Sequence, residues 1–205
     1  MRAEIRSVVG IDRLPSMSDK LRLPYTSAAI LELLRVSNIV STNLPHSTTT
    51  ETEIGVREPQ QSNAQTFSGF ASGDNVLAFS DLRKVGMTIP AGACIDGDLN
   101  YVLAHDPIFK DPKELRPERF LNEDGKTLNK AVVDRCIPFS IGRRQCAGES
   151  LARMELFLVV SATVQHFRVL PPLGRPLCLE AIHSLMHSPK SSVVRLAPVD
   201  RTNDI

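Results

Sequence analysis

The apolar positions of the chain predict helices that are separated by short extended segments. Residues 28–36 read Ala-Ala-Ile-Leu-Glu-Leu-Leu-Arg-Val, which are mostly strong helix formers, and Pro24 just upstream is compatible with a helix start. A second helix is predicted for residues 149–162, because apolar side chains recur there at helical spacing. The stripe, which we expect to pack in the core, consists of Leu151, Met154, Leu158 and Ala162.

Other segments have the patterns of strands, turns and loops. Residues 37–50 are β-branched and polar, which favours an extended segment, and residues 192–196 alternate like a strand. Residues 87–95 predict a hairpin with its turn at 90–92, and a helical stretch is expected at 100–105.

Residues 51–85 are rich in Gln, Ser, Asn and Gly and have only weak apolar periodicity. We interpret them as a long surface loop. Long helices with a few short strands together predict a mainly α fold with small β-sheets, of the α+β class.

Composition excludes some classes of function. Lys+Arg number 24 and Asp+Glu 23, for a net charge of +1, so no global field favours nucleic acid. The four cysteines show no CxxC pairing, which favours a reducing, cytosol-facing environment. No apolar run approaches the about 18–20 residues of a membrane span, and we expect no anchor or signal peptide in this sequence.

One cysteine occupies a position that indicates chemistry. Cys146 follows a turn that contains glycine and arginine, and it precedes the helix predicted from residue 149. A sulfur near a helix N-terminus is favoured as the thiolate, which can serve as a nucleophile, a redox sensor or a metal ligand. The other cysteines, interpreted as core or surface thiols, are Cys94, Cys136 and Cys178.

Three motifs in order carry a family resemblance. Residues 32–35, Glu-Leu-Leu-Arg, form an ExxR motif, residues 117–120 read Pro-Glu-Arg-Phe, and residues 139–148 satisfy FxxGxRxCxG. Together they resemble the C-terminal part of a cytochrome P450, nearest to the animal microsomal branch that metabolises drugs and steroids. The resemblance implies that residues 1–205 are a partial, truncated domain of that fold, with a loop insertion at 51–85. That insertion is either a genuine surface loop or a translated intron.

The resemblance also implies a haem site. It makes Cys146 the proximal thiolate ligand of haem iron, and it pairs Arg144 and His46 with haem propionates. Phe139 would pack near the proximal haem face. Glycines at 142 and 148 would let the backbone approach the porphyrin and the sulfur, where a Cβ would collide. The implied cofactor-binding residues are Cys146, Arg144, His46, Phe139, Gly142 and Gly148.

Two further residue sets follow from the resemblance. Glu32, Arg35 and Arg119 match the family's buried, salt-bridged triad, which is structural. From the sequence alone, Glu32 and Arg35 could form an ordinary surface pair at i,i+3 spacing, but their apolar flanks and the matching Arg119 favour burial. The positions matched to a lipophilic substrate pocket are Ile39, Val40, Thr42, Leu44, Ile182 and Met186.

The implied function is a haem-thiolate monooxygenase that inserts one oxygen atom of O2 into a lipophilic substrate. Its partners would be an NADPH-dependent P450 reductase, docked near Arg135 and Arg143, and cytochrome b5. The full-length parent would lie at the cytosolic face of the endoplasmic reticulum membrane. No catalytic residue is assigned, because the distal helix signature Ala-Gly-x-x-Thr is not found. Two alternatives stay open: a truncated, catalytically incompetent product, and a P450-fold isomerase that needs no reductase.

Overall fold

The computed structural model describes residues 1–54, 69–70, 87–174, 176, 181–182, 186–190 and 193–199. The helices and helical turns are α1 (Arg2–Val9), η1 (Met17–Arg22), α2 (Pro24–Ser37), α4 (Leu99–His105), η2 (Pro117–Phe120), α5 (Lys130–Val133), η3 (Gly142–Arg144) and α6 (Glu149–His166). The strands are β1 (His46–Ser47), β2 (Thr52–Ile54), β3 (Gly69–Phe70), β4 (Met87–Ile89), β5 (Cys94–Gly97), β6 (Phe167–Leu170), β7 (Ala181–Ile182), β8 (Ser188–Pro189) and β9 (Arg195–Pro198). Helices with small antiparallel sheets confirm the predicted α+β class.

Helix α2 contains the predicted helix at 28–36 and begins four residues earlier, at Pro24. Proline suits this first position because it has no N–H to leave unpaired. The next two N–H groups, of Tyr25 and Thr26, donate to the two carboxylate oxygens of Glu4 at 2.8 Å each. A side chain of α1 therefore caps α2 and fixes the angle between the two helices.

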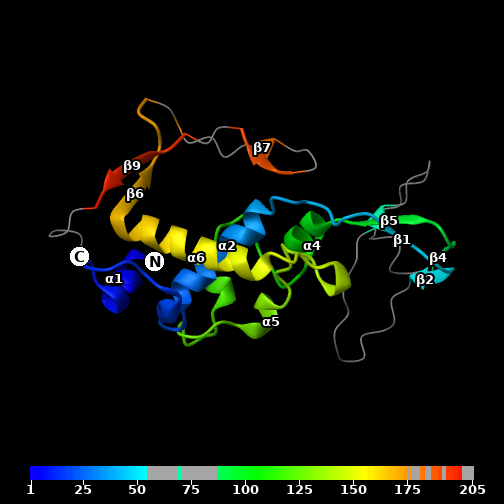
Figure 1. Cartoon of the computed structure of the whole chain (residues 1–205), viewed down its shortest axis with the longest axis horizontal. Helices are drawn as coiled ribbons and strands as arrows, with labels where there is room; N and C mark the ends of the chain where they lie inside the picture. Colours follow the sequence, from blue (N-terminus) through cyan, green and yellow to red (C-terminus); the bar gives the residue numbers. More distant parts are fainter. Residues whose placement is uncertain are drawn as a thin grey trace.

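Helix α6 is the longest element and lies alongside α1 and α2 (Figure 1). Its buried residues are Phe157, Ser161 and Gln165, whereas Leu151 is 56% and Met154 is 40% exposed. The predicted core stripe is therefore wrong for its N-terminal half. The helix carries apolar residues on nearly all sides, so helical spacing alone could not identify the face that α1 and α2 cover.

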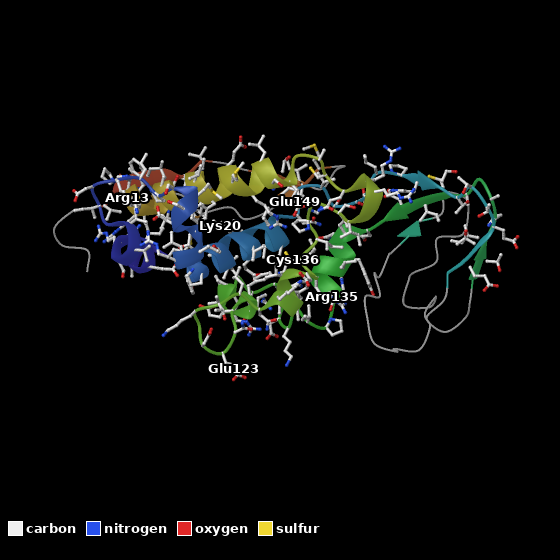
Figure 2. The ribbon with its side chains drawn as sticks, turned by 60° about the horizontal axis from the view of Figure 1, so that its bottom comes forward. Arg13, Lys20, Glu123, Arg135, Cys136 and Glu149 are labelled. Carbon is white, nitrogen blue, oxygen red and sulfur yellow. The ribbon has the colours of Figure 1, made fainter. Side chains whose placement is uncertain are left out.

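Two apolar clusters enclose α2. The first lies between α1, α2 and α6, and its buried members are Ile5, Val9, Leu23, Ile30 and Phe157. The second joins α2 to the segments from α4 to α5, and its buried members are Ala28, Leu31, Leu103, Phe109, Phe120, Val132 and Cys136. Figure 2 shows Cys136 at the centre of the molecule and Glu123 at the outer tip of the loop between η2 and α5.

The strands between α2 and α4 form one interrupted antiparallel ribbon. β1 pairs with β5, and β2 pairs with β4, in registers that continue one another: His46 lies opposite Ile95, and Thr52 opposite Ile89. Between the two pairs, Thr48 exchanges backbone hydrogen bonds with the opposite strand. Residues 55–86 therefore connect two paired strands.

The predicted hairpin at 87–95 is wrong. β4 and β5 do not pair with each other; β4 pairs with β2, and β5 pairs with β1 and β3. The turn at 90–92 interrupts a strand without reversing it, because Pro90 cannot donate to the ladder and Gly92 has a φ of +81°.

The predicted loop at 51–85 contains β2 and β3, and its residues 55–68 and 71–85 lie outside the described ranges. Toward the C-terminus, β6 pairs with β9 and β7 pairs with β8. β9 begins at Arg195, inside the stretch that was expected to be a strand, while Ser192 is outside the described part of the chain. No helix of the described residues is long and apolar enough to cross a membrane.

Candidate functional site

Glu32, Arg35 and Arg119 meet in a buried ion-pair network between α2 and η2. Arg35 donates from Nε to Glu32 Oε2 at 2.8 Å and from Nη2 to Oε1 at 2.9 Å, and Arg119 Nε donates to Oε1 at 3.0 Å. The side chains of Glu32, Arg35 and Arg119 are 0%, 2% and 3% exposed. This burial excludes the alternative of an ordinary surface pair.

Backbone groups complete this network. Arg35 also donates to the carbonyls of Leu103 and Pro112, at 3.1 and 2.7 Å, and Arg119 donates to the carbonyl of Lys110 at 2.6 Å. The backbone N–H of Arg116 donates to Glu32 Oε1 at 3.0 Å. These partners carry no side-chain signal, so sequence reasoning could not find them. They tie the segment from residue 103 to residue 119 to α2.

The network also sets the protonation of Glu32. Burial alone would raise the pKa of this carboxyl group, but hydrogen bonds from Arg35 and the Arg116 backbone, with the charges of Arg35 and Arg119, hold it below its ordinary value. Glu32 is therefore a carboxylate paired with two guanidinium groups, which is the condition in which a buried charge is tolerated.

The loop that carries Cys146 is held by backbone hydrogen bonds. The N–H of Cys146 donates to the carbonyl of Phe139 at 3.0 Å, and the N–H of Glu149 donates to the carbonyl of Cys146 at 3.3 Å. Gly148 is the N-cap residue of α6, so Cys146 lies two residues before the N-cap of that helix, and its side chain is exposed. The predicted position near a helix N-terminus is what the structure shows.

The two glycines of the loop have different reasons to be glycine. Gly142 has a φ of +83°, where a side chain is strained, and a Cβ there would meet no atom within 4 Å. A Cβ on Gly148 would lie 3.9 Å from the sulfur of Cys146, which is an ordinary contact. The expected collision with the sulfur is therefore wrong, and of the two positions it is Gly142 that opens onto free space beside the loop.

A chain of polar contacts links the loop to α6. Arg153 lies over the ring of Phe139, with its guanidinium carbon 5.1 Å from the ring centroid. Its Nε donates to Glu149 Oε1 at 2.6 Å, and Glu149 accepts a second hydrogen bond from Gln145. The i,i+4 spacing of Glu149 and Arg153 was a usable sequence signal for the ion pair. No pattern in the sequence indicated the contact between Arg153 and Phe139.

The two residues matched to haem propionates lie apart in the chain. Arg144 is exposed in η3, and within the described ranges it forms no ion pair or side-chain hydrogen bond. His46 is exposed in β1, and no hydrogen bond or ion pair joins it to the cysteine loop in this part of the chain. Both side chains are thus available to an anionic group, but no contact brings them together.

The two segments matched to a substrate pocket lie side by side. Val40 forms an antiparallel bridge with Met186, and the backbone N–H of His187 donates to the carbonyl of Ile39 at 2.6 Å. Thr42 forms a bridge with Asp98. The large apolar members of the predicted set are about half exposed or more: Ile39 53%, Val40 44%, Leu44 70%, Ile182 55% and Met186 52%.

The donor set at Cys146 is a single sulfur. Among the described residues, no group of three or more His, Cys, Asp or Glu side chains could hold a metal ion. A lone exposed sulfur close to the open space at Gly142 fits a cofactor that brings the other metal ligands with it, as the four nitrogens of haem do. Arg144, which has no carboxylate partner among the described residues, fits the propionates of such a cofactor.

Comparisons with known proteins identify the family of this chain. The family model "Cytochrome P450" matches residues 1–57 and 77–195. Cytochrome P450 1A2 of Oryctolagus cuniculus is 35% identical over 200 residues, which cover 97% of this chain and 33% of the relative. Cytochrome P450 2E1 of the same species is 36% identical over 171 residues, which cover 83% and 28%. Farnesoate epoxidase of Bombyx mori is 34% identical over 199 residues, which cover 97% and 34%. The chain thus spans about a third of the length of these relatives, and it belongs to the cytochrome P450 family.

Proposed function

We propose that this chain is the haem-binding part of a haem-thiolate monooxygenase and that Cys146 is the axial ligand. The observation that carries the proposal is the exposed sulfur of Cys146 on a loop closed by the hydrogen bond to Phe139, with open space at Gly142. The proposed activity is insertion of one oxygen atom of O2 into a lipophilic substrate.

The residues matched to the haem site have separate roles in this proposal. Cys146 would bind iron, Arg144 and His46 would pair with the propionates, and Phe139 would support the proximal side. Haem, when bound, supplies the centre that activates dioxygen, and a thiolate ligand favours O–O cleavage. Gly142 keeps the backbone conformation that places Cys146 on the open side of the loop. The buried network around Glu32 holds the preceding segment in place and takes no part in the chemistry.

Partners and substrate follow from the exposed surfaces. The half-exposed apolar set around Val40 and Met186 suits a lipophilic substrate. Arg143 has no ion-pair partner in the described part of the chain, so it is free to meet acidic residues of an NADPH-dependent reductase or cytochrome b5. Arg135 is half exposed but pairs with Asp106 at 2.9 Å, which makes it the weaker docking candidate. For the full-length protein we propose the cytosolic face of the endoplasmic reticulum membrane.

A second candidate is a product that cannot catalyse the reaction by itself. It is favoured by the apolar side chains that the described residues leave uncovered, such as Leu151 at 56% and Val159 at 63% exposure on α6. Faces of this kind are normally covered by further protein. We therefore propose that the chain alone binds haem without turning over substrate.

The test is to express the chain, add haem, and record the spectrum of the reduced, CO-bound form. We expect a thiolate-type Soret band that is lost in Cys146→Ala and kept in Cys94→Ala, since Cys94 is also exposed but lies in β5. A band that survives in Cys146→Ala would overturn the ligand assignment. Turnover with a reductase would overturn the second candidate, and rearrangement of a peroxide substrate without a reductase would favour the isomerase alternative.

A further inference from the structure

A cavity lies behind the cysteine loop, between α2, α6 and the segment around α5. Its volume is about 460 Å³, which is within the size range of small-molecule sites. Cys146 is not among the lining residues, although its neighbour Gln145 is. The sulfur of Cys146 therefore does not border the cavity, although the loop that carries it does.

The walls of the cavity are mainly apolar. Ile30 and Leu31 come from α2, Phe157 comes from α6, and Phe139 and Ile141 come from the cysteine loop. A flexible hydrocarbon chain placed here would leave water and gain dispersion contacts on several sides.

Two polar groups at the wall have no hydrogen-bond or ion-pair partner among the described residues. Lys20 forms no ion pair or side-chain hydrogen bond with any described residue. The hydroxyl of Ser27 likewise has no hydrogen-bond partner in the described part of the chain, although Ser27 is only 7% exposed. The Ser27 hydroxyl is therefore able to donate a hydrogen bond to an occupant of the cavity.

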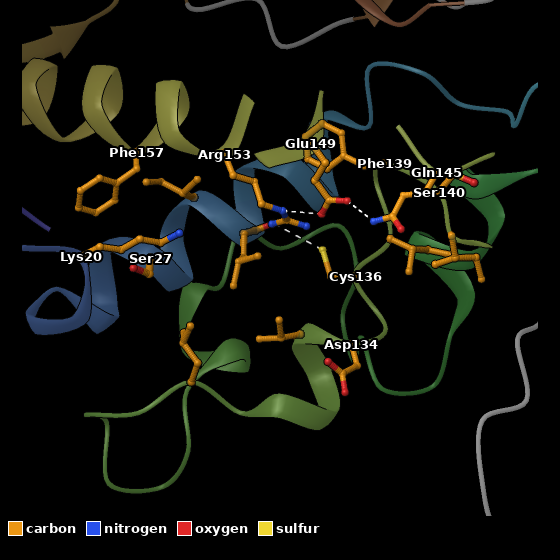
Figure 3. A pocket seen from close by; sticks show the side chains of 16 residues that line it. Lys20, Ser27, Asp134, Cys136, Phe139, Ser140, Gln145, Glu149, Arg153 and Phe157 are labelled. Atoms are coloured by element: carbon orange, nitrogen blue, oxygen red, sulfur yellow. Dashed lines mark hydrogen bonds and ion pairs between the residues drawn. The ribbon is translucent and has the colours of Figure 1, made fainter. Parts of the chain in front are cut away.

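The other charges at the wall are already neutralised. Arg153 pairs with Glu149 at 2.6 Å, and Asp134 pairs with Lys130 at 2.5 Å. Among the described residues, Lys20 is the cation at the cavity that has no counter-charge. Figure 3 shows Lys20 and Ser27 at one end of the cavity, with Glu149 and Gln145 toward the other.

We propose that this cavity is a binding site for a medium-chain monocarboxylate, separate from the haem site. The carboxylate pairs with the ammonium group of Lys20 and accepts a hydrogen bond from Ser27, and the hydrocarbon chain lies along Phe157 and Ile30. A single negative charge matches the single uncompensated cation, and the apolar walls match the chain. Because Phe139 and Gln145 line the same cavity, an occupant would also contact the loop that carries Cys146.

The probe is sodium decanoate, titrated calorimetrically into the 205-residue chain below the concentration at which decanoate forms micelles. We expect one site per chain and an affinity that falls about tenfold in Lys20→Gln, through loss of a charge-assisted contact. The matched control is Lys113→Gln, which removes an exposed lysine outside the cavity and should leave the affinity unchanged.

Two further measurements test whether decanoate binds in the cavity. Ser27→Leu fills the cavity with a helix-compatible side chain and should abolish the site, and 1-decanol, which lacks the charge, should bind at least tenfold more weakly than decanoate. Far-UV circular dichroism confirms that each variant is folded. Equal affinity of folded Lys20→Gln and Lys113→Gln, or equal binding of decanol, would place decanoate on the exposed apolar faces and overturn the proposal. No haem is needed, so the outcome is independent of the assignment of Cys146.

Discussion

The buried network of Glu32, Arg35 and Arg119 and the loop around Cys146 are both motif regions, but only the first is complete. Each charge of the network has its partner within the described residues, and the side chains are 3% exposed or less. In the cysteine loop the backbone is closed by hydrogen bonds, whereas the side chains of Arg144 and Cys146 face outward. The difference indicates that the described residues complete the ion-pair network by themselves, whereas Arg144 and Cys146 of the proposed haem site have no side-chain hydrogen-bond or ion-pair partner among them.

Helix α6 likewise has one face that the described residues cover and one that they leave exposed. Phe157 is 1% exposed against α1 and α2, and Leu151 on the same helix is 56% exposed. A helix that is apolar on all sides normally lies inside a larger protein. The uncovered side of α6 is thus a second surface that the described residues do not complete.

Removal of the central carboxylate should give the largest effect. Glu32→Ala would leave two buried guanidinium groups without a counter-charge, so we expect the free energy of unfolding to fall by about 3–5 kcal/mol. Glu123→Ala, at the exposed tip of the loop between η2 and α5, should change it by less than about 0.5 kcal/mol. Urea unfolding followed by circular dichroism measures both. Similar values for the two variants would show that the network does not anchor the fold.

The two faces of α6 should respond differently to truncation. Phe157→Ala should lower the free energy of unfolding by about 3 kcal/mol, the low end for such a change, because Phe157 already borders a cavity. Leu151→Ala should cost less than about 0.5 kcal/mol, since little area is lost from the interior. The same denaturation experiment applies. A large loss for Leu151→Ala would mean that the face is covered, for example by a second copy of the chain.

A positive charge without the planar guanidinium group of Arg119 should stabilise the network only in part. Arg119→Lys keeps the positive charge beside Glu32 but loses the hydrogen bonds that guanidinium directs to Lys110 and to the carboxylate, so we expect a loss of about 2 kcal/mol. Arg135→Lys affects an ion pair that is half exposed and should cost at most about 1 kcal/mol. An undiminished stability of Arg119→Lys would mean that the network acts through charge alone.

The smallest effect is expected from pH. The folded-state pKa of Glu32 lies below the ordinary value of 4.5, so its contribution is fully present above pH 4.5 and is lost as the pH falls through the folded-state pKa. Unfolding free energies measured from pH 7 downward should therefore decline less steeply below pH 4.5 in Glu32→Gln than in the unmodified chain. Parallel curves would contradict the assignment of a depressed pKa.

Motifs with fixed spacing predicted the network well, because the side chains of Glu32 and Arg35 recognise one another on one helix. Helix α2 was also predicted, since its residues favour a helix by propensity and by pattern. Two predictions failed where the deciding partner lies far away in the sequence. The strand at 87–89 pairs with residues 52–54, and that pairing is invisible to local turn chemistry at 90–92.

The candidate site was predictable in part. The place of Cys146 before α6 followed from its motif, but the stacking of Arg153 on Phe139 depends on how the loop folds back on the helix. The cavity behind the loop could not be predicted at all, because a void arises from the packing of three separate segments. Cys136, which lines this cavity, is a further example. Its neighbours in the sequence do not indicate that burial raises the pKa of its thiol to about 12.

The most direct measurement is hydrogen–deuterium exchange of the chain without and with haem. We expect amides of residues 24–37 to be protected equally in both states, because the network of Glu32, Arg35 and Arg119 is complete without haem. Residues 139–148 should gain protection only when haem binds. Cys146→Ala should remove that gain and leave residues 24–37 unchanged. Full protection of residues 139–148 before haem is added, or an equal change in both regions, would contradict the contrast between the complete network of Glu32, Arg35 and Arg119 and the exposed loop around Cys146.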